Sequence, residues 1–326
     1  MGKKSVLLLL TLVLCAPLQW AQSPAQPDQV ATQAGPENQA PPANDEPVTT
    51  IRSTVQEVNV IFTATDKKGR FKKDLKPQDL AVLDDGRPPA RVNSFSSQTD
   101  LPLRVGLLMD VSGSITDRFT FEQESAIKFF NQILRPDTDK AFVLAFDSIQ
   151  RVTQDFTDNT NALAKATREL RPGGGTALYD AVKLASVDKL MKAKADRPVR
   201  KVIVLLSDGE DNQSRVTRAQ AIEAARRGEV IIYAISTNNS NTKSRGDKML
   251  ERLAEETGGR AFFPNNVDDV AHAFNTIQEE LRSQYALSYK PADFTADGRY
   301  RTIQISDTKN KNVVIRARKG YFAPHE

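Results

Sequence analysis

The sequence predicts an α/β protein built on a doubly wound, mainly parallel sheet of Rossmann-like topology, with a second, smaller β-sandwich-like domain. Between Leu101 and Leu281, short apolar runs alternate with amphipathic helical patterns, which is the order of βα units. Before and after this block, apolar residues alternate with polar ones, as in half-buried strands. With 326 residues, the chain has room for one domain of about 180 to 200 residues and a smaller companion.

Residues 1–21 are predicted to be a signal peptide. Lys3 and Lys4 precede the apolar stretch from Val6 to Ala16, which is too short to span a bilayer, and cleavage is expected near Ala21. The sequence therefore predicts an exported protein, periplasmic or secreted, with no transmembrane helix in its mature form. The single cysteine, Cys15, follows a bulky leucine and matches a lipoprotein signal poorly, so lipid anchoring is the alternative.

A linker and an N-terminal β segment are expected next. Residues 22–50 are rich in Pro, Gln and Ala without apolar periodicity, which predicts disorder. In residues 51–98, alternation from Val55 to Ala64 is followed by shorter strand patterns at Leu80–Leu83 and Arg91–Phe95. These strands are too few to close a core by themselves.

Residues 99–283 are predicted to form the α/β domain. Its buried strands are expected at Arg104–Met109, Ala141–Phe146, Val202–Leu206 and Val230–Ile235. An antiparallel edge strand is expected at Arg151–Phe156, and a last short strand at Ala261–Phe263. The helical patterns cover Phe119–Leu134, Asn161–Leu170, Ala177–Met191, Thr217–Arg227, Lys248–Thr257 and Val267–Leu281.

Alternation returns in the C-terminal β segment, residues 284–326. Strands are expected at Tyr285–Tyr289, Tyr300–Ser306, Val313–Arg318 and Gly320–Phe322. Because both flanking segments are rich in strands, we expect them to pair into one β-sandwich into which the α/β domain is inserted.

The charge balance argues against a nucleic-acid partner. The formal net charge is +4, and loss of Lys3 and Lys4 with the signal peptide would lower it to +2. Such a balance provides no basic footprint for nucleic acid.

A candidate metal site begins where the first buried strand ends. Asp110, Ser112 and Ser114 follow this strand, at the edge where open α/β sheets bind ligands. Alternate residues of the turn can converge on one point, and oxygen ligands of this kind suit Mg²⁺, Mn²⁺ or Ca²⁺. By itself, however, the pattern is also common in ordinary turns.

Two further segments extend this pattern. Three glycines precede Thr176 and would let its hydroxyl approach a bound ion, although a flexible loop with Thr176 as a helix N-cap explains them as well. Asp208 follows the strand Val202–Leu206 and could equally be a turn aspartate. Together the segments place two carboxylates and three hydroxyls at neighbouring strand ends.

Over residues 101–281 the chain resembles the von Willebrand factor type A domain. The metal-ion-dependent adhesion site of that family is D-x-S-x-S, then a Thr, then an Asp, which matches Asp110, Ser112, Ser114, Thr176 and Asp208. The resemblance implies that the hydroxyls bind the ion directly or through water, and that the aspartates act largely through water. The flanks, including Leu80–Gly86 and Arg316–Phe322, are similar to a group of secreted bacterial proteins with related domains.

These ligands point to binding rather than catalysis. Three neutral hydroxyls leave a divalent cation electrophilic, and an open coordination position can accept a carboxylate. The predicted function is therefore metal-dependent capture of a protein partner through its acidic residue, with no catalytic residues. The sequence leaves open the resident metal and the oligomeric state.

Other function classes remain as alternatives. A metal-dependent phosphohydrolase of the haloacid dehalogenase type would need an aspartate where Ser112 stands, and a serine hydrolase would need a base, for which only His272 and His325 are present. No phosphate-binding loop of the P-loop type occurs. Some type A domains are accessory subunits of AAA+ machines, a reading that the predicted signal peptide disfavours.

Overall fold

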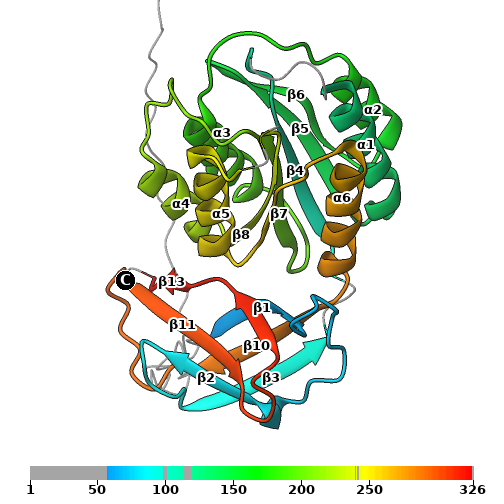
Figure 1. The fold of residues 1–326 in the computed structure, drawn as a ribbon. Helices are drawn as coiled ribbons and strands as arrows, with labels where there is room; N and C mark the ends of the chain where they lie inside the picture. The colour runs from blue at the N-terminus through cyan, green and yellow to red at the C-terminus, as the bar shows by residue number, and fades with distance from the viewer. Residues whose placement is uncertain (1–56, 98–100, 114–118, 239, 241, 325–326) are drawn as a thin grey trace, which may run out of the picture. The chain divides into compact units, whose positions relative to one another are not determined.

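The computed structural model describes residues 57–97, 101–113, 119–238, 240 and 242–324 (Figure 1). The predicted signal peptide and linker lie outside the described residues, as do Cys15, Ser114 and His325.

The central sheet is mainly parallel, as predicted, and has the strand order β6-β5-β4-β7-β8-β9. Its strands are β4 (Leu103–Asp110), β5 (Lys140–Phe146), β6 (Gln150–Thr157), β7 (Arg200–Ser207), β8 (Val230–Ser236) and β9 (Ala261–Phe262). β4 pairs in parallel with β5 and β7, whereas β6 runs antiparallel to β5 at the edge. The carboxyl ends of the central strands therefore meet at one edge of the sheet.

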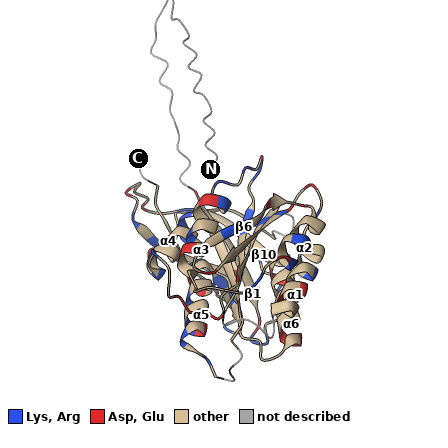
Figure 2. Ribbon diagram, turned by 90° about the horizontal axis from the view of Figure 1, so that it is seen from above, with Lys and Arg blue, Asp and Glu red and all other residues tan. Residues whose placement is uncertain are grey.

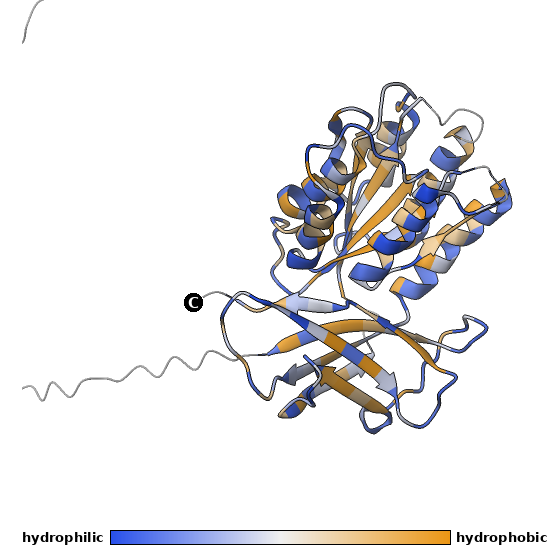
Figure 3. Cartoon of the chain, turned by 60° about the vertical axis from the view of Figure 1, so that its left-hand side comes forward, coloured by the Kyte–Doolittle hydropathy of each residue, from blue (hydrophilic) through white to orange (hydrophobic). Residues whose placement is uncertain are grey.

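Helices cover both faces of this sheet, which confirms the doubly wound architecture. They are α1 (Phe119–Ile133), α2 (Thr160–Arg168), α3 (Leu178–Leu184), α4 (Arg218–Arg227), α5 (Arg245–Thr257) and α6 (Val267–Leu281). Residues of α1, α2 and α6 share one buried core with the sheet, and residues of α3, α4 and α5 share the other. The strands are apolar along their length and the outer helix faces are polar (Figure 3).

The helix predicted at Ala177–Met191 is interrupted. After α3 the chain forms a π-helical turn, η2 (Ala185–Leu190), in which the Met191 N–H donates to the Ser186 carbonyl at 2.9 Å. Ala185 and Leu190 are both fully buried, and the wider turn brings both into the core. A search for a 3.6-residue period does not detect such a turn.

Helix α5 begins three residues before its predicted start. Ser244 is the N-cap and forms a capping box with Asp247, whose N–H donates to the Ser244 hydroxyl at 2.9 Å. The added turn brings Gly246 against the loop that follows β7.

The flanking segments pair with each other in two antiparallel sheets, with orders β12-β1-β10-β3 and β13-β11-β2. Their strands are β1 (Val58–Thr65), β2 (Leu80–Asp84), β3 (Arg91–Ser97), β10 (Gln284–Lys290), β11 (Tyr300–Asp307), β12 (Val314–Ala317) and β13 (Gly320–Phe322), with a 3₁₀ turn η1 (Pro77–Asp79) before β2. β1 pairs with β10 and β12, and β2 pairs with β11. Strands from before and after the α/β block thus share one core, in which Phe62 and Tyr285 stack with ring centroids 5.5 Å apart.

Glu280, near the end of α6, links the α/β domain to the flanking β segments. Its side chain is fully buried and accepts hydrogen bonds from Arg316 of β12 at 2.6 Å and from Tyr233 of β8 at 3.2 Å. Only two residues separate α6 from β10. In the described part of the chain, no helix is long and apolar enough to cross a membrane.

Candidate metal centre

Asp110 is the last residue of β4 and is only 1% exposed. One carboxylate oxygen, Oδ1, accepts a hydrogen bond from the Ser112 backbone N–H at 2.9 Å. The other, Oδ2, accepts one from the Ser207 hydroxyl at 2.7 Å. Ser207 ends the neighbouring strand β7, so this bond links the two strand ends that carry the predicted acidic residues.

Burial raises the pKa of the Asp110 carboxyl to about 6, against hydrogen bonds from Ser207 and Ser112 that favour the ionised form. The negative charge of Asp208 adds to the rise. A cation near this carboxylate would stabilise its ionised form and lower the pKa again.

The loop after Asp110 is held against the glycine-rich loop. The Gly173 N–H donates to the Val111 carbonyl at 2.6 Å, and the Gly113 N–H donates to the Gly174 carbonyl at 3.3 Å. Gly174 has a positive φ of 92°, and a Cβ at this position would lie 3.1 Å from the Asp147 side chain. The conformation of the glycine-rich loop beside Asp147 therefore depends on glycine at this position. Ser112, at 3% exposed, is nearly as buried as Asp110.

Thr176 connects the glycine-rich loop to the loop after β7. Its N–H donates to the Asn212 side-chain oxygen at 2.9 Å, and its carbonyl accepts the Asn212 and Gln213 N–H groups, each at 3.0 Å. Ala177, and not Thr176, is the N-cap residue of α3. The Asp211 carboxylate receives the Tyr179 N–H of the first helical turn. The Thr176 side chain is therefore not used as a helix cap, and the residue is 5% exposed.

Asp208 follows β7 directly and is partly exposed. Its Oδ1 accepts the Glu210 N–H at 3.0 Å. In the same turn, Gly209 has a φ of 81°, and a Cβ there would lie 2.2 Å from the Gly246 carbonyl oxygen. The start of α5 thus fixes the turn that carries Asp208.

Hydrogen bonds therefore join the three loops that carry Asp110, Ser112, Thr176 and Asp208, while Ser114 lies outside the described residues. Two residues with a part in this arrangement, Ser207 and Asn212, were not among the predicted site residues. Each stands beside a predicted aspartate or in the same turn, but polar turn residues are too common for the sequence to mark them.

The donor set consists of carboxylate and hydroxyl oxygens, which suit a hard divalent cation such as Mg²⁺, Mn²⁺ or Ca²⁺. Among the residues that the structure describes, no group of three or more His, Cys, Asp or Glu side chains could hold a metal ion. Acidic and basic residues are interspersed over the outer helices (Figure 2).

Comparisons with known proteins agree with this fold. A family profile described as von Willebrand factor type A domain matches residues 105–280, more than half of the chain. The uncharacterized protein sll0103 of Synechocystis sp. is 26% identical over 184 residues, which cover 56% of this chain and 42% of that protein. The chain thus spans about two fifths of the length of this curated relative.

Solved structures with a similar fold include the PilB minor pilin from Streptococcus sanguinis, at 16% identity and a TM-score of 0.46, covering 57% of this chain and 62% of the pilin. Another is proximal thread matrix protein 1 from the mussel byssus, described with a zinc-occupied MIDAS motif, at 18% identity and a TM-score of 0.48. That match covers 60% of this chain and 49% of the matrix protein.

Proposed function

The chain belongs to the von Willebrand factor type A domain family, and on this basis we propose that it is an exported, non-enzymatic protein that binds a partner protein through a divalent cation. The cation would be held by Asp110, Ser112, Ser114, Thr176 and Asp208, and the partner would offer an acidic side chain. The observation that carries the proposal is the hydrogen-bonded contact of three loops around the buried Asp110.

The proposed ligands divide into two kinds. Ser112, Ser114 and Thr176 would contribute neutral oxygens, and Asp110 and Asp208 would contribute negative charge. Asp110 already accepts hydrogen bonds on both oxygens, which favours a role through water for this carboxylate. A bound Mg²⁺, Mn²⁺ or Ca²⁺ would supply an electrophilic centre for a carboxylate of the partner.

A hydrolase would need a general base beside one of the hydroxyls. The only histidine in the described part of the chain is His272, whose side chain is exposed on α6. The backbone N–H and the side chain of Ser112 both hydrogen-bond to the Asp110 carboxylate. This arrangement favours the binding function over the hydrolase alternative.

The first prediction is that Mg²⁺ or Mn²⁺ raises the melting temperature of the full chain and not that of Asp110→Ala. A ligand at 100 times its Kd stabilises the native state by about 2.7 kcal/mol, which for a chain of this size is a shift of several degrees. Asp188→Ala is the control, because Asp188 is a half-exposed aspartate of η2 with a surface lysine as its partner. Thermal shift with and without metal measures the effect.

Equal metal-induced shifts for the wild type and Asp110→Ala would overturn the metal site. The partner is tested by capture from an exported protein fraction in Mg²⁺ or in chelator, where retention that is independent of metal argues against a metal bridge. Turnover in a phosphatase or esterase panel that Asp110→Ala abolishes would instead support the hydrolase.

A further inference from the structure

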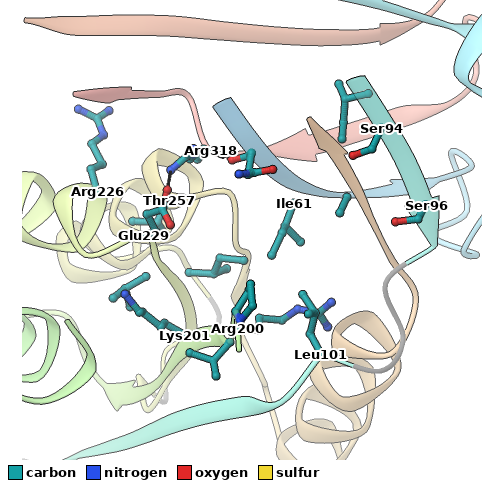
Figure 4. A pocket seen from close by; sticks show the side chains of 17 residues that line it. Ile61, Ser94, Ser96, Leu101, Arg200, Lys201, Arg226, Glu229, Thr257 and Arg318 are labelled. Carbon is teal, nitrogen blue, oxygen red and sulfur yellow. Dashed lines mark hydrogen bonds and ion pairs between the residues drawn. The ribbon is translucent and has the colours of Figure 1, made fainter. Parts of the chain in front are cut away.

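A pocket of about 340 Å³ lies at the amino ends of β7 and β8 (Figure 4). It is lined on one side by residues of β1, β3 and β10 and on the other by residues 198–201 and 229–231. Arg200 begins β7, and Asp208 follows its other end, so the strand separates the pocket from the candidate metal centre by about 25 Å. The pocket therefore lies far from the candidate metal centre.

Apolar side chains form much of the pocket wall. Ile61, Leu101, Val199, Ile231 and Ala286 line it and remain partly exposed. A ligand with a hydrocarbon part would remove this apolar surface from water, which favours binding. The volume also lies within the range of about 300 to 1,000 Å³ that is usual for small-molecule sites.

The charged side chains of the pocket are mostly cationic. Figure 4 shows Arg200, Lys201, Arg226 and Arg318 around it, with Glu229 as the single acidic residue of the lining. The Lys201 ammonium donates to a neutral acceptor, the Gly228 carbonyl, at 3.1 Å. The lining has a formal charge of +3, but Arg226 pairs with Glu256 outside it, so the net charge that includes this partner is +2. This charge favours an anionic ligand over a neutral one.

Arg318 is the cation best placed to bind such an anion. Its side chain is 13% exposed, and its two terminal nitrogens donate to Glu229 and to the Asn59 carbonyl, each at 2.7 Å. The third donor, Nε, is buried without an acceptor in the described residues. A buried donor without an acceptor is destabilising, and the oxygen of an anionic ligand would satisfy it.

Glu229 holds the place that a ligand carboxylate would take. Its backbone has a φ of 54°, in the left-handed region that is unfavourable for a residue other than glycine. Its side chain is 61% exposed, and an ion pair exposed to this degree stabilises little. A carboxylate entering the pocket could therefore replace Glu229 on Arg318 while Glu229 turns to solvent.

We propose that this pocket binds a small amphipathic monocarboxylate of the medium-chain fatty acid class. Its carboxylate pairs with Arg318 in place of Glu229, and its chain lies along Ile61, Val199 and Ile231. Binding does not require the cation at the other end of the sheet.

The test uses octanoate and isothermal titration calorimetry on the full chain. We expect saturable binding to the wild type, at least tenfold weaker binding to Arg318→Met, and severalfold tighter binding to Glu229→Gln, which removes the competing charge. Arg87→Met is the matched control, because Arg87 is a largely exposed arginine that pairs with Asp293 outside the pocket. Asp110→Ala should bind octanoate as the wild type does, which separates this site from the metal centre.

Two further ligands identify what is recognised. Octanol that binds as tightly as octanoate would overturn the anion requirement, and inorganic phosphate that competes equally well would overturn the requirement for an apolar chain. If Arg318→Met does not fold, Glu229→Gln provides the test, because the Glu229 side chain is exposed and its replacement should not affect folding. An unchanged affinity of Glu229→Gln for octanoate would refute the proposal. The absence of saturable octanoate binding to the wild type would also refute it.

Discussion

Two buried aspartates differ in how the protein compensates their charge: Asp110, which ends β4, and Asp139, which accepts the Leu103 N–H where β4 begins. Burial raises the pKa of Asp110, and its hydroxyl and amide partners offset this only in part. Burial acts in the same direction on Asp139, but hydrogen bonds from Arg135, from the Leu103 N–H and from Arg282 hold its pKa below the ordinary value. The charge of Asp139 is therefore compensated within the chain, whereas that of Asp110 suits an external cation.

This contrast leads to a prediction for Asp139→Asn. Asp139 accepts hydrogen bonds from Arg135 at 3.0 Å and from Arg282 at 2.9 Å. Losing its charge should lower the free energy of unfolding at neutral pH by about 2 to 3 kcal/mol. Because its pKa is lower in the folded state, this stabilisation is full at neutral pH and is lost as the pH falls through the folded pKa.

Urea unfolding of the wild type and Asp139→Asn from pH 7 to pH 3 measures the effect. The difference in stability should be largest at pH 7 and should shrink below about pH 4, where the carboxyl protonates in the unfolded chain. A difference that stays constant over this range would show that the loss comes from packing and not from charge.

The residues of the candidate site could be predicted only where a pattern set them apart. Asp110, Thr176 and Asp208 each follow a strand or a glycine run, so their places were readable from the sequence. Ser207 and Asn212 contact Asp110 and Thr176 because of the register between β4 and β7 and the path of a turn. Such contacts between distant residues leave no local signal.

At the scale of elements, the turn after β7 and the first turn of α5 depend on each other. A Cβ on Gly246 would lie 2.1 Å from the Asp208 carbonyl oxygen, and one on Gly209 would meet the Gly246 backbone. Two glycines therefore allow a backbone contact that places Asp208.

We predict that Gly209→Ala destabilises the protein by about 2 kcal/mol or more and weakens the Mg²⁺-induced thermal shift, because the turn must move away from α5. Gly69→Ala is the matched control. Gly69 has a φ of 79°, close to the 81° of Gly209, but nothing lies within 4 Å of its added Cβ. Chemical unfolding and thermal shift compare the two variants, and equal losses in both would attribute the effect to the φ angle alone.

Most elements agree with their predicted positions within about three residues, and the differences have local causes. The start of α5 depends on a capping box at Ser244 and Asp247, which the apolar pattern did not include. The π-helical turn η2 depends on the burial of both Ala185 and Leu190. The capping box at the start of α5 could have been recognised in the sequence. The π-helical turn could not, because it depends on which side chains the folded core buries.

At the scale of the molecule, Glu280 links the α/β region to the flanking strands. Arg316, which is 23% exposed, pairs with this fully buried carboxylate. Removal of one partner of a buried ion pair leaves the other charge uncompensated, which is costly.

We therefore predict that Arg316→Met lowers the stability of the full chain by about 3 kcal/mol, and that the double variant Glu280→Met and Arg316→Met recovers much of the loss.

Residues 98–283 produced alone should still unfold cooperatively, because both cores of the central sheet lie within this range. Thermal and chemical unfolding measure the stability of the full-length variants and the cooperativity of the isolated segment. The absence of a cooperative transition in the isolated segment would refute the proposed insertion of an autonomous domain.

The sequence by itself determined the doubly wound sheet, the flanking strands and the acidic and hydroxyl residues at the strand ends, because periodicity and turn chemistry are local properties of the chain. Tertiary structure alone decided that Ser207 binds Asp110, that Gly246 supports the Asp208 turn, and that Arg318 and Glu229 meet at a second pocket. The physical reason is that these contacts join residues distant in sequence, and their geometry follows from strand register and packing.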